Sequence, residues 1–259
     1  MYPIVAKLGP ITVYSYGVMM VIAFLTTTYL TQRAALALPA AGRPMSQEQI
    51  MDFSCVALLG GLLGGRAFYV ALNWQAFAQA PAVIVAIWHG GLVWYRGFVG
   101  GITAGWFYTR AKRLAFLRVV DLFIPFLALG HAIGRLGCFL NGCCYGKPTE
   151  AWCGVVVPGQ AEPVLPTQLF EAAGLCILFL GLKSLQRPSV LSRPGRVLGA
   201  YLVSYGILRF LLEPLRGDQP IWWAGFTLQQ LISIGMIIIG LISLRLFRLS
   251  VAPSVRRKS

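Results

Sequence analysis

Long runs of apolar residues, separated by short polar segments, occupy almost the whole chain. Seven of these runs are long enough to cross a bilayer as a helix, which takes about 20 mostly apolar residues. They cover Val13–Leu38, Ile50–Leu72, Ala82–Tyr108, Val119–Gly137, Thr167–Leu185, Val197–Leu212 and Phe226–Phe247. A polar interruption at residues 88–91 places the start of the third membrane segment near Leu92. The pattern predicts an all-α polytopic membrane protein with about seven transmembrane helices.

The composition supports a membrane protein and argues against the main alternative. The chain is 57% hydrophobic and 12% charged, with a mean hydropathy of +0.71, whereas soluble domains carry about 25% charged residues. Its net charge of +14 is also typical of nucleic-acid-binding proteins. Here, however, the basic residues lie in short loops, where membrane topology explains them, and we expect no nucleic-acid partner. The sequence predicts one transmembrane domain, residues 1–248, a basic cytoplasmic tail, residues 249–259, and no cleavable signal peptide.

The basic residues also predict the orientation of the chain. Fifteen of the 22 Lys and Arg residues lie after the first, third and fifth apolar stretches or in the C-terminal tail. The loops on the other side hold only Lys7, Lys147 and Arg216. Positive residues are enriched in cytoplasmic loops, so the N-terminus is expected outside and the C-terminus in the cytoplasm.

Two further features concern loops and packing. The longest non-apolar segment, residues 137–165, lies on the exterior side between the fourth and fifth predicted helices. Loops of this length are usually functional or disordered, and its aromatic and apolar content argues against disorder. Glycine pairs at residues 60–61, 64–65 and 100–101 predict helix backbones in close contact.

Four arginines fall within or at the ends of apolar stretches: Arg66, Arg96, Arg135 and Arg209. A guanidinium group near the bilayer centre costs about 2.5–3.5 kcal/mol, so such residues usually face a polar cavity. Arginine also binds a phosphate group through two parallel hydrogen bonds. These residues predict an intramembrane pocket for an anionic lipid headgroup.

Two blocks supply further candidates for this pocket. Residues 134–149 combine Arg135 with glycines whose backbone N–H groups are suited to an anion-binding nest; a re-entrant turn with a snorkelling arginine is the alternative. In the second block, Arg209 and Glu213 share a helical face and are suited to an ion pair, which has a structural or a functional role. Arg216 follows just outside that helix, where it reaches a headgroup or lies at the interface as an ordinary arginine.

Four cysteines fall in the exterior segment: Cys138, Cys143, Cys144 and Cys153. An oxidising exterior favours disulfides. Free thiols and a metal site are the alternatives, although the C-x4-C-C-x8-C spacing is not a usual zinc pattern. His131 is expected to be a helix residue near the site rather than a general base. The sequence gives no positive indication of a metal or organic cofactor.

In order and spacing, these blocks resemble the bacterial prolipoprotein diacylglyceryl transferase family over nearly the whole chain. The family pattern G-R-x-G-N-F-x-N-x-E-x-x-G is similar to residues 134–146, and H-P-[ST]-Q-L-Y-E is similar to residues 165–171. The pattern R-x-x-x-E-x-x-R-x-x-D is similar to residues 209–218, with Asp218 one place early. Ser15-Tyr16-Gly17 resembles the aromatic-Tyr-Gly of the family's first span.

The resemblance implies an enzyme of the bacterial plasma (inner) membrane that acts in lipoprotein maturation. A diacylglyceryl group is transferred from phosphatidylglycerol to the lipobox cysteine thiol of a prolipoprotein, so that a thioether forms and glycerol phosphate leaves. Preorganised arginines in a low-dielectric site stabilise the charge of such a leaving group. By resemblance, Arg135 and Arg216 hold the headgroup, and Tyr16 is a further catalytic position. Substrate-binding positions are also expected at Arg96, Asn141, Gly146, Gln168, Arg209 and Glu213.

The chain also departs from the family pattern. Cys138 and Cys143 stand where the family has Asn and Glu, and Arg96 stands where it has a His. Without that His, deprotonation of the substrate thiol falls to Tyr16, to His131 or to the positive field of Arg96. The chain is therefore expected to be a divergent member. The alternatives are a paralogue with another acceptor and a non-enzymatic transporter or lipid-binding protein for an anionic solute.

Overall fold

Long helices dominate the computed structural model, which describes residues 1–9, 11–79, 84, 94–187, 193–217 and 219–249. They are α1 (Ser15–Leu36), α2 (Gln47–Leu72), α4 (Trp94–Ala111), α5 (Phe116–Asn141), α6 (Thr167–Ser184), α8 (Arg196–Leu212) and α9 (Leu228–Leu249). Within the described residues, α2, α5, α6, α8 with the turn that follows it, and α9 are long and apolar enough to cross a membrane. The prediction of a helical membrane protein is confirmed, and most helix ends lie within four residues of the predicted stretches.

The chain divides into two compact units, which are described separately. Unit 2, residues 43–119, contains α2, the short helix α3 (Trp74–Gln79) and α4. A Cβ atom added at Gly100 would lie 2.5 Å from the carbonyl oxygen of Gly60 and 2.9 Å from the Cα atom of Gly64. The glycines therefore let the α2 and α4 backbones touch, as predicted from their spacing.

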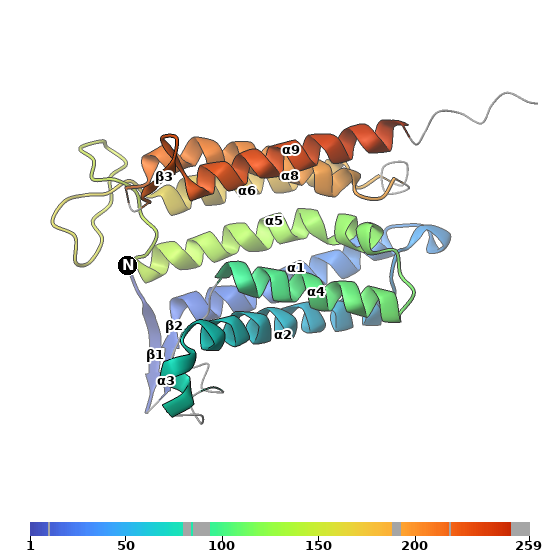
Figure 1. Ribbon diagram of the computed structural model, residues 1–259, viewed down its shortest axis with the longest axis horizontal. Coiled ribbons are helices and arrows are strands. Elements are labelled where there is room, and N and C mark those ends of the chain that lie inside the picture. The colour runs from blue at the N-terminus through green and yellow to red at the C-terminus, as the bar shows by residue number, and fades with distance from the viewer. Residues whose placement is uncertain (10, 80–83, 85–93, 188–192, 218, 250–259) are drawn as a thin grey trace, which may run out of the picture. The chain divides into compact units, whose positions relative to one another are not determined.

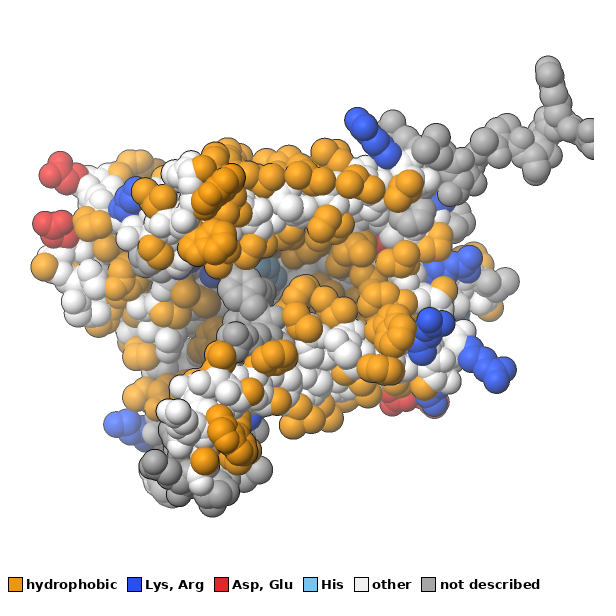
Figure 2. All heavy atoms as spheres, viewed as in Figure 1, with side chains coloured by type: hydrophobic (Ala, Val, Ile, Leu, Met, Phe, Trp, Pro, Cys, Tyr) orange, Lys and Arg blue, Asp and Glu red, His pale blue; other side chains and the backbone are white. Residues whose placement is uncertain are grey.

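Unit 1, residues 1–42 and 120–259, contains the remaining long helices. In it α8 lies alongside both α6 and α9 (Figure 1). Helix α1 packs on α5, where the Thr27 hydroxyl donates a 3.2 Å hydrogen bond to the Phe126 carbonyl oxygen. Figure 2 shows hydrophobic side chains along the length of α9, in keeping with the many large apolar residues that this helix exposes. An apolar surface of this kind suits contact with lipid.

A buried acid fixes the start of α8. Asp121 on α5 is fully buried, and its carboxylate accepts backbone hydrogen bonds from Gly195 at 2.6 Å and from Leu198 at 2.8 Å. These are N–H groups that a helix start leaves without an intrahelical partner. The contact holds α8 against α5 and sets the direction in which α8 runs toward the candidate site.

Two β-hairpins were not predicted from the sequence. Strand β1 (Ile4–Leu8) pairs antiparallel with β2 (Ile11–Tyr14) ahead of α1, and β3 (Ile221–Trp223) pairs with β4 (Phe226–Thr227) ahead of α9. The second hairpin turns through Ala224 and Gly225, which have φ angles of 50° and 82°. Two such residues between paired strands are typical of a tight hairpin turn. Short 3-10 turns lie at Ala40–Gly42 (η1) and Glu213–Leu215 (η4).

The exterior loop between α5 and α6 begins later than predicted. The block that begins at Gly134 was expected to form a turn with exposed backbone N–H groups, but α5 continues to Asn141. A Cβ atom added at Gly137 would lie 3.0 Å from the Met19 Cβ atom and 3.4 Å from the Tyr16 ring. Gly137 therefore allows close packing of α5 on α1. The prediction of an anion-binding nest is therefore wrong for residues 134–141, because helical hydrogen bonds use these N–H groups.

Candidate functional site

Glu171 is the centre of a buried ionic network in unit 1. It lies one turn into α6, and its side chain is only 3% exposed. Its Oε1 atom lies 2.9 Å from Arg135 Nη2 on α5 and accepts a 2.9 Å hydrogen bond from the Tyr205 hydroxyl on α8. His131 Nε2 lies 3.8 Å from the same oxygen. Glu171 thus links three helices and holds the Arg135 side chain in place.

A second carboxylate extends this network along α8. Arg209 Nη2 lies 2.7 Å from Glu213 Oε2, so the ion pair predicted from the spacing is confirmed. The alignment is too poor for a hydrogen bond, and the contact is best described as an ion pair. Arg209 Nη1 also lies 3.8 Å from Glu171 Oε2. The Thr227 hydroxyl donates a 2.8 Å hydrogen bond to Glu213 Oε1 and so ties β4 to the same network.

Arg216 lies just after α8, next to the loop that follows α5. It follows η4 directly and is 9% exposed, so it is buried rather than an ordinary interfacial arginine. The neighbouring Leu215 carbonyl accepts a 2.9 Å hydrogen bond from the Lys147 backbone. Beside it, a Cβ atom added at Gly146 would lie 2.6 Å from the Leu215 carbonyl oxygen and 2.7 Å from Thr167 Cγ2. Only glycine fits at this position, which explains Gly146 through the close approach of three segments.

The predicted polar positions around α6 and α1 also gather at this end. The Gln168 amide donates a 2.7 Å hydrogen bond to the Cys143 carbonyl, and the Asn141 side chain hydrogen-bonds the Cys143 thiol. Gln168 Oε1 is buried without a hydrogen-bond partner among the described residues. Tyr16 lies at the start of α1, 36% exposed, with its ring against Gly137. Gln168 thus contacts the loop that follows α5, and Tyr16 contacts α5 itself.

Three cysteines form a cluster beside the arginines. The Sγ atoms of Cys138, Cys143 and Cys144 all lie within 4.8 Å of one another, and none is in a disulfide. Cys153, in contrast, is not part of the cluster. Hydrogen bonds with the Cys138 and Cys143 thiols, and then the positive charges of Arg216 and Arg135, lower the pKa of the Cys144 thiol. Cys144 is therefore within electrostatic reach of both arginines that were predicted to bind phosphate.

Two of the arginines are paired with the two carboxylates. Arg135 and Arg209 lie against Glu171, and Arg209 also lies against Glu213. Buried charges are costly unless they are paired. The two carboxylates therefore make it possible for the two guanidinium groups to lie between the helices.

Two of the four arginines singled out from the sequence are not placed at this site. Arg66, in unit 2, donates a 2.8 Å hydrogen bond from Nε to the Ile84 carbonyl and lies over the rings of Tyr69 and Phe77. Those contacts stabilise unit 2 internally. Arg96 lies in the first turn of α4, but its side chain, like all of Asp218, is outside the described part of the chain.

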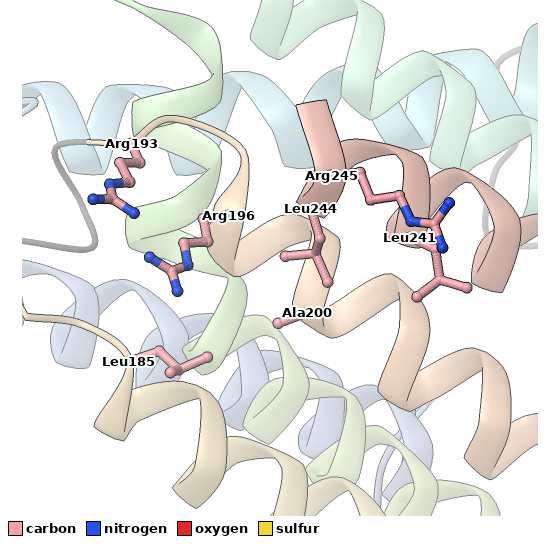
Figure 3. A pocket seen from close by; sticks show the side chains of 7 residues that line it. All are labelled: Leu185, Arg193, Arg196, Ala200, Leu241, Leu244 and Arg245. Carbon is pink, nitrogen blue, oxygen red and sulfur yellow. The ribbon is translucent and has the colours of Figure 1, made fainter. Parts of the chain in front are cut away.

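A separate cavity of about 360 Å³ lies at the other end of unit 1 (Figure 3). Its lining combines three arginines from the α8 start and the α9 end with four apolar side chains: Arg193, Arg196, Arg245, Leu185, Ala200, Leu241 and Leu244. No ion pair joins any of the three guanidinium groups to a residue that the structure describes. These arginines lie in the segments that were predicted to face the cytoplasm.

Sequence reasoning missed the central position of Glu171. Glu171 entered only as the last residue of the family-like block 165–171, and neither Tyr205 nor Thr227 was assigned a role. A carboxylate inside an apolar stretch was the available indication, because such a group is as costly in a membrane as an arginine. The cysteine cluster was also not predicted, since its geometry depends on the backbone turn after α5.

The fold and this network define a multi-pass helical membrane protein with charged side chains buried between its helices. The family model for prolipoprotein diacylglyceryl transferase matches residues 3–246. Relatives named phosphatidylglycerol–prolipoprotein diacylglyceryl transferase are 33% identical in Vibrio cholerae and 30% identical in Clostridium tetani, each over 93% of this chain and over 89% and 96% of the relative. One in Vibrio vulnificus is 35% identical over 92% of this chain and 89% of the relative. The chain belongs to the prolipoprotein diacylglyceryl transferase family.

Proposed function

We propose that this chain transfers a diacylglyceryl group from phosphatidylglycerol to the lipobox cysteine thiol of prolipoproteins, the first step of bacterial lipoprotein maturation. Family membership and the names of the relatives support the reaction. The observation that carries the assignment of the site is the Arg135–Glu171 contact of 2.9 Å, buried between α5 and α6. It holds a guanidinium group in a fixed orientation inside an apolar helix bundle.

The reaction needs stabilisation of a departing phosphate. The thiol sulfur attacks the glyceryl carbon, a C–S bond forms, and the C–O bond to phosphorus breaks with its electron pair leaving on glycerol phosphate. The leaving group gains one negative charge relative to the diester. Arginine donors fixed before the reaction stabilise this charge without reorganising, and in a site of low dielectric their effect is large. We assign Arg135 and Arg216 to this task, with Arg209 and Glu213 maintaining the field around Glu171.

The other predicted positions have supporting roles in this proposal. Gln168 and Asn141 hold the loop after α5, and Gly146 permits the approach of the segment that carries Arg216. Tyr16 covers the exposed side of the site from α1. His131 lies next to Glu171, so its imidazole is directed into the network rather than toward the cysteines. We keep Arg96 as a substrate-binding position on the resemblance alone.

We further propose the topology predicted from the basic residues. Seven helices, α1, α2, α4, α5, α6, α8 and α9, cross the bacterial plasma (inner) membrane, with the N-terminus outside and the C-terminus in the cytoplasm. Residues 1–248 form the membrane domain, and residues 249–259 are a cytoplasmic tail. Support comes from the lengths of these helices, which are 17 to 26 residues within the described part. On this topology, residues 142–166 between α5 and α6 face the exterior.

A reconstituted assay tests the proposed reaction. The purified chain is incubated with phosphatidylglycerol vesicles and a lipobox peptide, and the peptide mass is measured. We expect the peptide to gain one diacylglyceryl unit, and the same peptide with Ser in place of its Cys to gain nothing. An unchanged Cys peptide, together with uptake of an anionic solute into liposomes that contain the protein, would contradict transferase activity and support a transporter.

A further inference from the structure

The turn after α5 brings Cys143 onto Cys138. The Gly142 N–H donates to the Phe139 carbonyl and the Cys143 N–H donates to the Cys138 carbonyl, both at 3.1 Å, while Gly142 has a φ angle of 73°. This pair of hydrogen bonds around a left-handed residue is the Schellman motif that ends many helices. Two cysteines five positions apart therefore meet because of the backbone, and not by side-chain flexibility.

Cys144 joins them through an unfavourable backbone conformation. Its φ angle is 65°, which costs a residue with a side chain roughly 1–2 kcal/mol. Two contacts from α6 hold the conformation: Gln168 donates to the Cys143 carbonyl at 2.7 Å, and the Thr167 hydroxyl donates to the Cys144 carbonyl at 3.1 Å. Residues kept in rare conformations by their surroundings are concentrated at functional sites and ligand clamps. Here the result is three Sγ atoms within 4.8 Å of one another.

Such a cluster matches the geometry of a thiolate metal site. Tetrahedral zinc with Zn–S bonds of about 2.3 Å separates its sulfur ligands by about 3.8 Å, so the three Sγ atoms need to close by about 1 Å at most. Thiolates are soft ligands that select zinc over magnesium or calcium. Three protein ligands also leave the fourth position open, which is the arrangement of catalytic rather than structural zinc. The Asn141 side chain, bonded to the Cys143 thiol, would orient one ligand from outside the metal shell.

We propose that Cys138, Cys143 and Cys144 bind one Zn²⁺ ion, and that its open position takes the thiol of the acceptor cysteine. This inference rests on the proposed function, which makes a thiol the nucleophile. Coordination to zinc deprotonates a thiol, which is the step for which this chain lacks the expected histidine. The proton passes to water when sulfur binds, the bound sulfur attacks the glyceryl carbon, and the C–O electron pair leaves with glycerol phosphate. The thioether product, a poorer ligand than a thiolate, then dissociates.

The position of the cluster suits this role. Cys144 is within electrostatic reach of Arg135 and Arg216, the two residues assigned to the phosphate. A thiolate on the metal and a phosphate on the arginines would thus be held next to each other, which lowers the entropic cost of bringing them together. Two of the three cysteines, Cys138 and Cys143, stand at the positions where this chain replaces the Asn and Glu of the family pattern, so the proposal accounts for these departures.

Metal binding is tested first, without any reaction. The full chain is purified in detergent, reduced, stripped with a chelator and titrated with Co²⁺ as a spectroscopic substitute for Zn²⁺. We expect one equivalent to bind with a thiolate-to-cobalt charge-transfer band, and Zn²⁺ to displace it. Cys138→Ser, Cys143→Ser and Cys144→Ser should each weaken binding by more than about tenfold, the smallest loss typical of even an outer-shell partner. Cys153→Ser, in the same loop but outside the cluster, is the matched control and should bind normally.

Either of two results in the same titration would contradict the proposal. One is the absence of a charge-transfer band in the reduced wild-type chain. The other is a band that Cys153→Ser removes and the three cluster variants retain. Mass measurement of the chain as isolated, without reductant, adds a third contrary outcome: a disulfide between two cluster cysteines in most molecules, with no bound metal.

Substrate coordination is tested next. Adding the lipobox peptide to the cobalt-loaded chain should change the charge-transfer band, and the Ser peptide should not change it. Equal spectra with both peptides would exclude thiol coordination. In the transfer assay, chelation should stop the reaction and Zn²⁺ should restore it. Full transfer by the metal-free chain would refute the zinc site and leave the proposed function intact. A zinc-loaded chain that transfers nothing to any lipobox peptide would instead refute the proposed function.

Discussion

Arg135 and Arg209 at one end of unit 1 form ion pairs with buried carboxylates, whereas Arg193, Arg196 and Arg245 at the other end line an open cavity. The α6 helix spans the distance between these ends, which is about 27 Å for its 18 residues. At the first end, ion pairs with Glu171 and Glu213 hold the guanidinium groups. At the second, no described residue pairs with them. The same type of side chain is therefore held by carboxylates in one place and has no ion pair with a described residue in the other.

The comparison shows that neither an arginine nor a cavity is enough to identify a site. The cavity has a volume of about 360 Å³, but no described residue forms an ion pair with its arginines. Around Glu171, side-chain positions are fixed before a ligand arrives, which is the condition for electrostatic stabilisation of a transition state.

Removing a guanidinium group should show the difference between the two ends most clearly, through its effect on the rate of diacylglyceryl transfer. Arg135→Ala and Arg216→Ala are each expected to lower diacylglyceryl transfer by a factor on the order of 10²–10³, the usual loss for a donor to a developing anion. Arg193→Ala, at the opposite end, is the matched control and should retain transfer within about twofold. Peptide mass spectrometry measures all three rates. Wild-type turnover in either of the first two variants would remove that arginine from the phosphate site.

Neutralising the central carboxylate should affect both stability and activity. Glu171→Gln keeps the shape of the side chain but leaves Arg135 without its partner, and breaking a buried ion pair costs about 3–5 kcal/mol. We expect a lower unfolding temperature in detergent, followed by circular dichroism, together with reduced transfer. Glu150→Gln changes an exposed loop carboxylate and should alter neither. If Glu171→Gln unfolds at the wild-type temperature, Glu171 does not hold the network together.

Two glycines with similar backbone angles distinguish strain from site geometry. Gly142 and Gly159 have φ angles of 73° and 87°, so an alanine at either costs roughly 1–2 kcal/mol. A Cβ atom at Gly142 would also lie 3.2 Å from Met1 Sδ, whereas Gly159 has open space. Because the backbone strain is similar, we expect similar losses of thermal stability in the two variants. Only Gly142→Ala changes the turn after α5, so we expect a loss of transfer only in that variant. Equal transfer rates for the two variants would show that the turn after α5 does not position the site.

The smallest effect is expected at the open cavity. Arg245 is exposed, and surface substitutions usually change stability by no more than about 0.5 kcal/mol. Arg245→Ala should therefore leave both the unfolding temperature and transfer nearly unchanged. A strong loss of transfer in this variant would show that the two ends are coupled. It would contradict the view that only the arginines near Glu171 support the reaction.

The helices could be predicted from the sequence because apolar length alone determines a membrane span. The Arg209–Glu213 pair could be predicted too, since both residues lie on one helix at a fixed spacing. Other contacts depend on segments far apart in the chain, as when Asp121 holds the start of α8 or Glu171 joins α5 to α8. No local pattern encodes those distances. The glycines at 134 and 137 misled the prediction because close helix packing and a turn use the same residue type.

A structure of the wild-type chain in phosphatidylglycerol nanodiscs without acceptor peptide would show directly whether Arg135 and Arg216 bind the lipid phosphate. We predict a lipid phosphate within hydrogen-bonding distance of both Arg135 and Arg216. A phosphate bound only at the Arg193–Arg196–Arg245 cavity, with both of those arginines remote from any lipid headgroup, would contradict it.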